Sequence, residues 1–126
     1  FISFCNFNQQ IKVLKLDNSK ITDQSIKYLI NCEFNQLQIL KLSKTQITDK
    51  AIEYLSKCHF KQLLGLYLEE TKITDIGIDN LSKCDFKLLE GLYLEGTQLS
   101  NNSIEYFKKC DFKNLKRLYL ENTSIT

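Results

Sequence analysis

Cysteine recurs in this chain at an almost constant interval. The five cysteines are Cys5, Cys32, Cys58, Cys84 and Cys110, at steps of 27, 26, 26 and 26 residues. A phenylalanine follows each cysteine two positions later, at Phe7, Phe34, Phe60, Phe86 and Phe112. A chain with a fixed period of this length folds as a stack of similar units, because one short unit cannot bury its own apolar face.

The period predicts one elongated domain over residues 1–126. Its complete copies span residues 7–33, 34–59, 60–85 and 86–111, and its partial copies span residues 1–6 and 112–126. The chain begins in an apolar stretch and stops inside a copy, whereas repeat stacks need polar caps to stay soluble. We therefore expect a piece of a longer polypeptide, in which further repeats or capping domains cover the ends.

Each copy changes from an alternating to a helical pattern of apolar residues. In the second copy, alternation predicts a strand over residues 39–43, and helical spacing follows over residues 48–58. Parallel strands pair about 4.8 Å apart, whereas packed helices need about 8 to 10 Å. The predicted fold class is therefore α/β: a solenoid in the shape of a horseshoe arc, with parallel strands on the concave face and short helices on the convex face.

In three of the copies, the predicted helix starts with a Thr-Asp pair. In the second copy, Thr48 suits the N-cap position and Asp49 places a carboxylate in the first turn, where it favours the helix dipole. In the fourth copy the pair is replaced by Ser100 and Asn101. That helix should start less firmly, because the cap remains but the charge is lost.

A longer motif is shared by the copies: L-x-x-L-x-L, a small polar residue, I-T-D, an amphipathic segment and a cysteine. The I-T-D triplet is intact from Ile21, Ile47 and Ile73, and it is replaced by Leu-Ser-Asn from Leu99. With this motif the copies resemble the cysteine-containing, 26-residue subfamily of leucine-rich repeats. The resemblance covers nearly all of residues 7–126.

This resemblance implies that the chain binds protein and does not catalyse a reaction. The subfamily is similar to the repeat region of F-box proteins, which recruits substrates to ubiquitin ligases, and to many cytoplasmic scaffolds. The Cys or Asn that often follows the strand in the family is a hydroxyl residue here, which can still bond to neighbouring backbone groups. These residues are Ser19, Thr45, Thr71, Thr97 and Thr123.

The cysteines and phenylalanines are expected to pack in the core. Metal-binding cysteines come in pairs two to four residues apart, whereas these are a whole repeat apart, and His59 is interpreted as a solvated turn residue. Disulfides between copies would need Cα atoms within about 7 Å, which the wider convex side should not offer. Buried thiols indicate a reducing compartment, and we expect a cytoplasmic protein.

The outward residues of the strands form the candidate binding surface, because equivalent residues of parallel strands line up in rows about 4.8 Å apart. The first row is Val13, Ile39, Gly65, Gly91 and Arg117, and the second row is Lys15, Lys41, Tyr67, Tyr93 and Tyr119. The third row is Asp17, Ser43, Glu69, Glu95 and Glu121. The fourth row, at the start of the loop, is Asn18, Lys44, Glu70, Gly96 and Asn122.

Part of this surface is predicted to bind a partner protein. The predicted binding residues are Tyr67, Tyr93, Tyr119, Glu69, Glu95, Glu121, Arg117, Lys15 and Lys41. Tyrosine supplies rigid contact area, cations could sit over its rings, and the glutamates would attract them. We therefore expect a partner segment with basic residues against the tyrosines and the bare backbone of Gly65 and Gly91, and an acidic stretch near the two lysines. Duplication alone could also have copied these exposed residues.

Charge and composition argue against several other functions. The net charge is only +2 and both signs are mixed, so we expect no nucleic acid and no membrane as partner. Three neighbouring glutamates could share protons, as the carboxyl pair of a retaining glycosidase does. An open sheet supplies no pocket that excludes water, and the one histidine lies elsewhere. We expect no enzyme, no cofactor and no metal.

Several roles remain open for a chain of this kind. The leading interpretation is an intracellular protein-interaction scaffold, and the alternative is the substrate-recruiting region of an F-box type ubiquitin ligase subunit. Glycosylation triplets begin at Asn80, Asn101 and Asn122, which keeps an extracellular leucine-rich-repeat receptor fragment as a further alternative. A structural role in a large assembly is the last.

Overall fold

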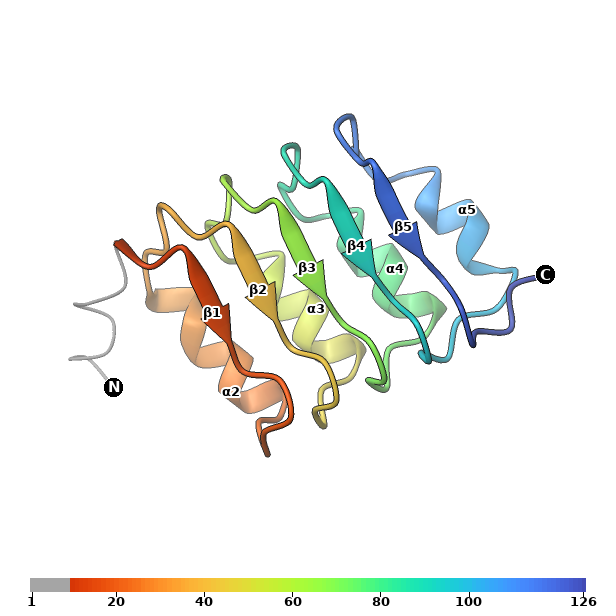
Figure 1. The fold of residues 1–126 in the computed structure, drawn as a ribbon, viewed down its shortest axis with the longest axis horizontal. Coiled ribbons are helices and arrows are strands. Elements are labelled where there is room, and N and C mark those ends of the chain that lie inside the picture. Colours follow the sequence, from red (N-terminus) through yellow and green to blue (C-terminus); the bar gives the residue numbers. More distant parts are fainter. Residues whose placement is uncertain (1–9) are drawn as a thin grey trace.

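The computed structural model describes residues 10–126, which form an open stack of strand and helix units (Figure 1). Cys5 and Phe7 lie outside the described residues. The strands are parallel and pair in chain order. They are β1 (Val13–Lys15), β2 (Ile39–Lys41), β3 (Gly65–Tyr67), β4 (Gly91–Tyr93) and β5 (Arg117–Tyr119). The helices cover one face of this sheet and leave the other face open, as the sequence pattern predicts.

The helices are short, and the shortest of them is the one that lacks the Thr-Asp start. They are α2 (Asp23–Tyr28), the 3-10 turn η2 (Leu29–Asn31), α3 (Asp49–Leu55), α4 (Asp75–Leu81) and α5 (Ser103–Phe107). Helix α5 has 5 residues, whereas α3 and α4 have 7 each. The weaker start predicted for this helix is confirmed, since Ser100 and Asn101 precede α5 instead of opening it.

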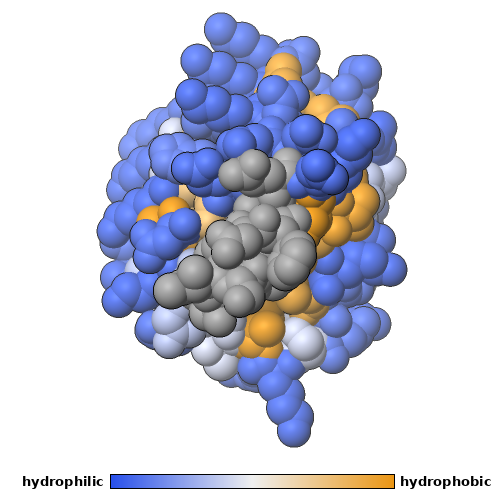
Figure 2. Space-filling view, turned by 90° about the vertical axis from the view of Figure 1, so that its left-hand side faces the viewer, coloured by the Kyte–Doolittle hydropathy of each residue, from blue (hydrophilic) through white to orange (hydrophobic). Residues whose placement is uncertain are grey.

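The core is a layer of apolar side chains between the sheet and the helices. The central strand residues Leu40, Leu66 and Leu92 are fully buried, and each such side chain stabilises the fold by about 1.5 to 3 kcal/mol. Phe34 and Phe60 are also buried, with ring centroids 5.7 Å apart in an edge arrangement. The predicted phenylalanine column is therefore part of the core. Seen from the β1 end, the rim of the molecule is mostly hydrophilic, and hydrophobic atoms show inside it (Figure 2).

The cysteines divide into two groups. Cys58, Cys84 and Cys110 are free and partly buried, and burial raises the pKa of these thiols to about 12, 12 and 11. Cys32 is disulfide-bonded, so the expectation of free thiols throughout is wrong at that position. The expectation rested on the wide separation of neighbouring units on the convex side, which does not exclude a disulfide at this position.

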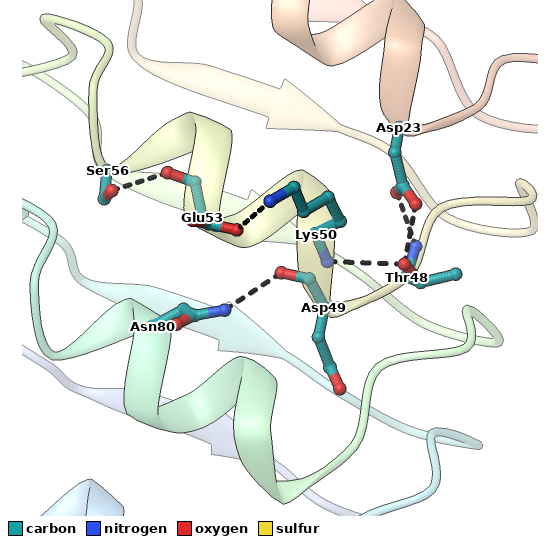
Figure 3. Close-up of polar contacts among 7 residues, drawn as sticks. All are labelled: Asp23, Thr48, Asp49, Lys50, Glu53, Ser56 and Asn80. Atoms are coloured by element: carbon teal, nitrogen blue, oxygen red, sulfur yellow. Dashed lines mark hydrogen bonds and ion pairs between the residues drawn. The ribbon is translucent and has the colours of Figure 1, made fainter.

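Adjacent units are joined at their helix starts by aspartate side chains. The backbone N–H and the hydroxyl of Thr48 donate to the two carboxylate oxygens of Asp23, at 2.7 and 2.6 Å (Figure 3). Asp49 accepts the equivalent pair of bonds from Thr74, and Asp75 accepts them from Ser100. The aspartate of each I-T-D triplet thus links its unit to the next one, a role that the helix-dipole argument did not predict.

The described part of the chain contains no group of three or more His, Cys, Asp or Glu side chains that could hold a metal ion. Across residues 10–126, no helix has the length and apolar character that crossing a membrane requires.

Candidate protein-binding face

The outward side of the sheet, here called the strand face, consists of the first three predicted rows. Strand pairing aligns Val13, Ile39, Gly65, Gly91 and Arg117 in one row. It aligns Lys15, Lys41, Tyr67, Tyr93 and Tyr119 in the next. Backbone hydrogen bonds continue the ladder past the strands, for example from Glu70 N–H to the carbonyl of Glu95 at 2.9 Å. The third row, Asp17, Ser43, Glu69, Glu95 and Glu121, is therefore also in register.

The three tyrosines of the strand face form a continuous stack. The ring centroids of Tyr67 and Tyr93 are 4.1 Å apart with an interplanar angle of 6°. Those of Tyr93 and Tyr119 are 5.1 Å apart at 16°. The Nζ atom of Lys41 lies 4.8 Å from the ring centroid of Tyr67, on the side of the preceding unit. Both ring faces of Tyr93 are therefore covered by its neighbours.

The glycines beside the stack make room for the tyrosine rings. A Cβ atom at Gly91 would lie 3.0 Å from Cε2 and from the hydroxyl oxygen of Tyr93. At Gly65 it would lie 2.9 Å from Cδ1 of Ile39 and 3.3 Å from Cε1 of Tyr67. Both glycines are buried. The prediction of bare glycine backbone open to a partner is therefore wrong, because each tyrosine ring packs against the glycine of its own strand.

A hydrogen bond orients the polar edge of the stack. The Nε–H of Arg117 donates to the hydroxyl of Tyr93 at 3.2 Å. Burial, together with a hydrogen bond to Tyr93 and the charge of that residue, raises the pKa of Tyr67 to about 12. The Tyr67 hydroxyl is thus a neutral hydrogen-bonding group at physiological pH. Arg117, predicted as a partner contact, also holds the stack in place, while Lys15 is exposed at the far end of the same face.

The glutamates beside the stack differ in their partners. The Ser43 hydroxyl donates to Oε1 of Glu69 at 2.6 Å. Oε1 of Glu95 is shielded from solvent and has no hydrogen-bond partner within the described residues. Burial, and then the charges of Glu69 and Glu121, raise the pKa of Glu95. Glu121 is exposed, so the three glutamates of the row differ: Glu69 accepts from Ser43, Glu95 has one oxygen without a partner, and Glu121 faces solvent.

Sequence reasoning missed the backbone geometry of the fourth row. All five positions have positive φ angles, between 53° and 69°: Asn18, Lys44, Glu70, Gly96 and Asn122. The signal was present, because asparagine and glycine, the residues that tolerate this conformation best, occupy three of the five positions. This row is a repeated left-handed turn that ends the ladder.

Two hollows of the described surface lie away from the strand face, in loops that precede the strands. One of about 310 Å³ is lined by Asn35, His59, Lys61 and Gln62. A second, also of about 310 Å³, is lined by Lys12, Asn35, Gln36, Gln38 and Gln62. Neither includes a residue of the strand face. His59 is exposed in its loop, as predicted.

Comparisons with known proteins bear on this architecture. A scan of protein-family models and a search of curated proteins gave no match. Among solved structures, the crystal structure of an internalin from Listeria monocytogenes is similar, with a TM-score of 0.72 and 30% sequence identity. The match covers 100% of this chain. The chain has a leucine-rich-repeat fold.

The leucine-rich-repeat chain spans 33% of the length of that internalin. The predicted solenoid with parallel strands on one face and short helices on the other is therefore confirmed as a fold. The narrower resemblance to the cysteine-containing subfamily and to F-box proteins stays a prediction.

Proposed function

We propose that this leucine-rich-repeat chain is a non-catalytic interaction scaffold whose strand face binds a segment of a partner protein. The observation that carries the proposal is the stack of Tyr67, Tyr93 and Tyr119 on the open side of the sheet. These rings are already ordered by each other, by Lys41 and by Arg117. A partner that meets them loses little side-chain entropy on their account, and pre-ordered aromatic residues favour tight contact.

From the charges of the strand face we infer the orientation in which the partner segment binds. Lys15 and Lys41 lie on β1 and β2, whereas Glu69, Glu95 and Glu121 follow β3, β4 and β5. Complementary charges steer association and set orientation. The proposed partner segment therefore carries basic residues over β3 to β5 and an acidic stretch over β1 and β2. Nucleic acid and membranes remain unfavoured partners, because both signs of charge are present on this face.

The proposal of a non-catalytic role rests on the exposed position of the glutamates in the third row. Its carboxylates lie along an open sheet, and the two hollows described above are lined by other residues. Catalysis needs reacting groups inside a site that excludes water. A cofactor is likewise not proposed.

A narrower role follows only from the resemblance to F-box repeats: recruitment of substrates to a ubiquitin ligase. It predicts a Skp-type adaptor and a cullin among the bound proteins. An extracellular receptor fragment is the second candidate, and the disulfide at Cys32 favours it. The free thiols of Cys58, Cys84 and Cys110 support the cytoplasm. Counting free thiols in protein purified from its own cells, with alkylation before lysis, separates these compartments.

The test is affinity purification of the tagged full-length protein from its own cells, followed by quantitative mass spectrometry. The wild type is compared with a variant in which Tyr67, Tyr93 and Tyr119 are changed to alanine. The matched control changes Tyr54 and Tyr106, on the helix side, to alanine. We expect a stoichiometric partner with the wild type and the control, and its loss from the strand-face variant. Retention of that partner by a folded strand-face variant would refute the proposal.

A further inference from the structure

We propose that a loop surface outside the strand face binds an acidic segment of a partner protein. The surface lies where the chain enters β1, β2 and β3, and its two hollows are lined in part by Lys12, Asn35, His59, Lys61 and Gln62. In the proposed complex, Lys12 and Lys61 pair with carboxylates, while Asn35 and Gln62 meet the peptide backbone. This surface shares no residue with the strand face, so its role goes beyond the proposed function.

Charge separates to the two ends of the strands. Loops that lead from a helix into a strand lie along one edge of the sheet, and loops that leave the strands lie along the other (Figure 1). The entering loops contain 8 lysines and 4 acidic residues, counted over residues 32–38, 56–64, 82–90 and 108–116. The leaving loops, through the first residue of the helix that follows, contain 3 lysines and 8 acidic residues, counted over residues 16–23, 42–49, 68–75, 94–103 and 120–126. The net charge of +2 therefore conceals a basic edge, which attracts an acidic partner.

The basic edge is least acidic at the loop that contains His59. Glu33, Asp85 and Asp111 occupy the position equivalent to His59 in the other entering loops. The loop of residues 56–64 instead contains two lysines and no carboxylate. An acidic segment therefore meets less repulsion at this loop than at its neighbours.

The two hollows lie at this same place and adjoin each other, because Asn35 and Gln62 line both. Each has a volume of about 310 Å³, at the lower end of the range for ligand sites. The described residues that line them carry amide, ammonium and imidazole groups and no carboxylate. The Gln38 N–H donates to the Lys12 carbonyl at 2.8 Å, so the units are held in register up to this edge.

The side chains that line the hollows are free to bind. Within residues 10–126 none of them makes a hydrogen bond or an ion pair. Elsewhere on the basic edge such groups are engaged: Lys116 lies 3.8 Å from Glu90, and Nδ2 of Asn114 donates to the Lys87 carbonyl at 2.7 Å. The hollows therefore combine a local excess of positive charge with uncommitted hydrogen-bonding groups.

An acidic peptide fits this surface better than a polyanion does. A side-chain amide has N–H donors and an acceptor oxygen, which complement the C=O and N–H of a peptide, and an ammonium group pairs with a carboxylate. Neighbouring units are about 4.8 Å apart at the strands and about 8 to 10 Å apart at the helices. Alternate residues of an extended peptide, about 6.6 Å apart, match an intermediate spacing in the loops. Nucleic acid carries a phosphate about every 3.4 Å along each strand, and Asp85 and Asp111 would repel its path over the next loops.

The test is an NMR titration of the ¹⁵N-labelled full chain with a defined probe, the peptide acetyl-(Ser-Glu)4-amide. Matched peptides carry glutamine or lysine in place of glutamate. Single-stranded oligothymidylate and heparin serve as polyanion probes. The side-chain amide signals of Asn35 and Gln62 report on the hollows themselves.

The variants separate the hollows from the rest of the basic edge. The first carries Lys12→Gln and Lys61→Gln together. Its matched control carries Lys87→Gln and Lys113→Gln, which remove the same charge from entering loops outside the hollows. A third variant, His59→Asp, gives this loop the carboxylate that the next two loops already carry. Backbone amide spectra confirm that each variant is folded.

We expect the glutamate peptide to shift the side-chain amide signals of Asn35 and Gln62 most, and the glutamine and lysine peptides to leave them in place. The variant without Lys12 and Lys61 should bind the glutamate peptide about tenfold more weakly, because two charged contacts are lost. The control double variant should lose less than about twofold, because salt screens distant charges. His59→Asp should weaken binding about threefold or more through repulsion between like charges.

Equal losses for the two double variants would overturn the proposal, because they would indicate attraction by the whole edge instead of binding in the hollows. Unmoved signals of Asn35 and Gln62 in the wild type would overturn it as well, whether or not a variant folds. Tighter binding of either polyanion at the same signals would replace the acidic peptide as the ligand. Loss of peptide binding on changing Lys15 and Lys41 to glutamine, with no loss for the first double variant, would assign the peptide to the strand face instead.

Discussion

Asp49→Ala should destabilise the stack by breaking one link between adjacent units. Asp49 accepts hydrogen bonds from the backbone N–H and the hydroxyl of Thr74, at 2.8 and 2.5 Å. The backbone carbonyl of Asp49 also accepts from the Asn80 side chain at 3.0 Å, a bond that alanine keeps (Figure 3). The substitution therefore tests the carboxylate alone.

The magnitude follows from the two lost bonds. A hydrogen bond to a charged group contributes about 1.5 to 3 kcal/mol. Asp49 is only partly buried, so we take each bond at or below the lower end of that range. For the two bonds together we expect a loss of about 2 to 3 kcal/mol in the free energy of unfolding. Part of this loss is the Thr74 N–H left without a partner. Loss of the favourable interaction between the Asp49 carboxylate and the dipole of α3 adds about 0.3 to 1 kcal/mol to this loss.

The chain contains its own precedent for the control substitution, Asp49→Asn. At the last junction the Asn101 side chain makes the same link: Thr126 N–H donates to its Oδ1 at 2.9 Å, and its Nδ2 donates to the Thr126 hydroxyl at 3.0 Å. An asparagine can therefore replace both bonds when the hydroxyl accepts. We expect Asp49→Asn to cost less than about 1 kcal/mol.

Urea denaturation followed by circular dichroism measures both variants, with the midpoint and the slope compared to the wild type. Asp79→Ala serves as a control outside the junctions between helix starts, since that carboxylate lies 4.0 Å from Lys109. A loss below about 0.5 kcal/mol for alanine would show that the aspartate link contributes little and would refute the reasoning. Equal losses for the alanine and asparagine variants would show that an asparagine does not replace the two bonds.

Three further predictions follow from single positions. Glu70→Asn should stabilise the fold by about 0.5 to 1 kcal/mol in urea titrations, because residue 70 has a φ of 53°; a loss of stability would contradict the turn geometry. The three free cysteines, at positions 58, 84 and 110, should react slowly with a thiol reagent at pH 8 until urea unfolds the chain, because burial raises their pKa values; rapid reaction in native buffer would argue against their burial. Glu95 has a raised pKa, so the native state binds its proton more tightly than the unfolded state, and stability is lost as pH rises from about 4.3 through the native pKa. Glu95→Gln should remove that part of the pH dependence, and an unchanged profile would contradict it.

The period of the sequence was enough to predict the rows of the strand face. Units of equal length stack in the same register, so residues 26 apart become neighbours, as Tyr67 and Tyr93 are. The alternation of apolar residues assigned Leu66 to the core, which the structure confirms. Local signals also predicted the weaker start of helix α5.

The contacts between units could not be predicted in the same way. The pattern within one copy does not state how a side chain is rotated or which atoms of the next copy it meets. The rings of the tyrosine stack could have stood apart with open faces; instead they cover each other and pack on Gly65 and Gly91. Asp49 could have served its own helix alone, yet its carboxylate bonds to the next unit.

The sequence by itself therefore determined the repeating unit, the strand register and the residues that face outward, because all three follow from a constant period and from burying apolar side chains. Only the tertiary structure decided which of those outward groups remain available. Stacking closes the ring faces of Tyr93 and engages Arg117. The Ser43 hydroxyl donates to Glu69, whereas Oε1 of Glu95 has no donor within the described residues. These outcomes depend on side-chain packing between neighbouring units, which periodicity alone does not specify.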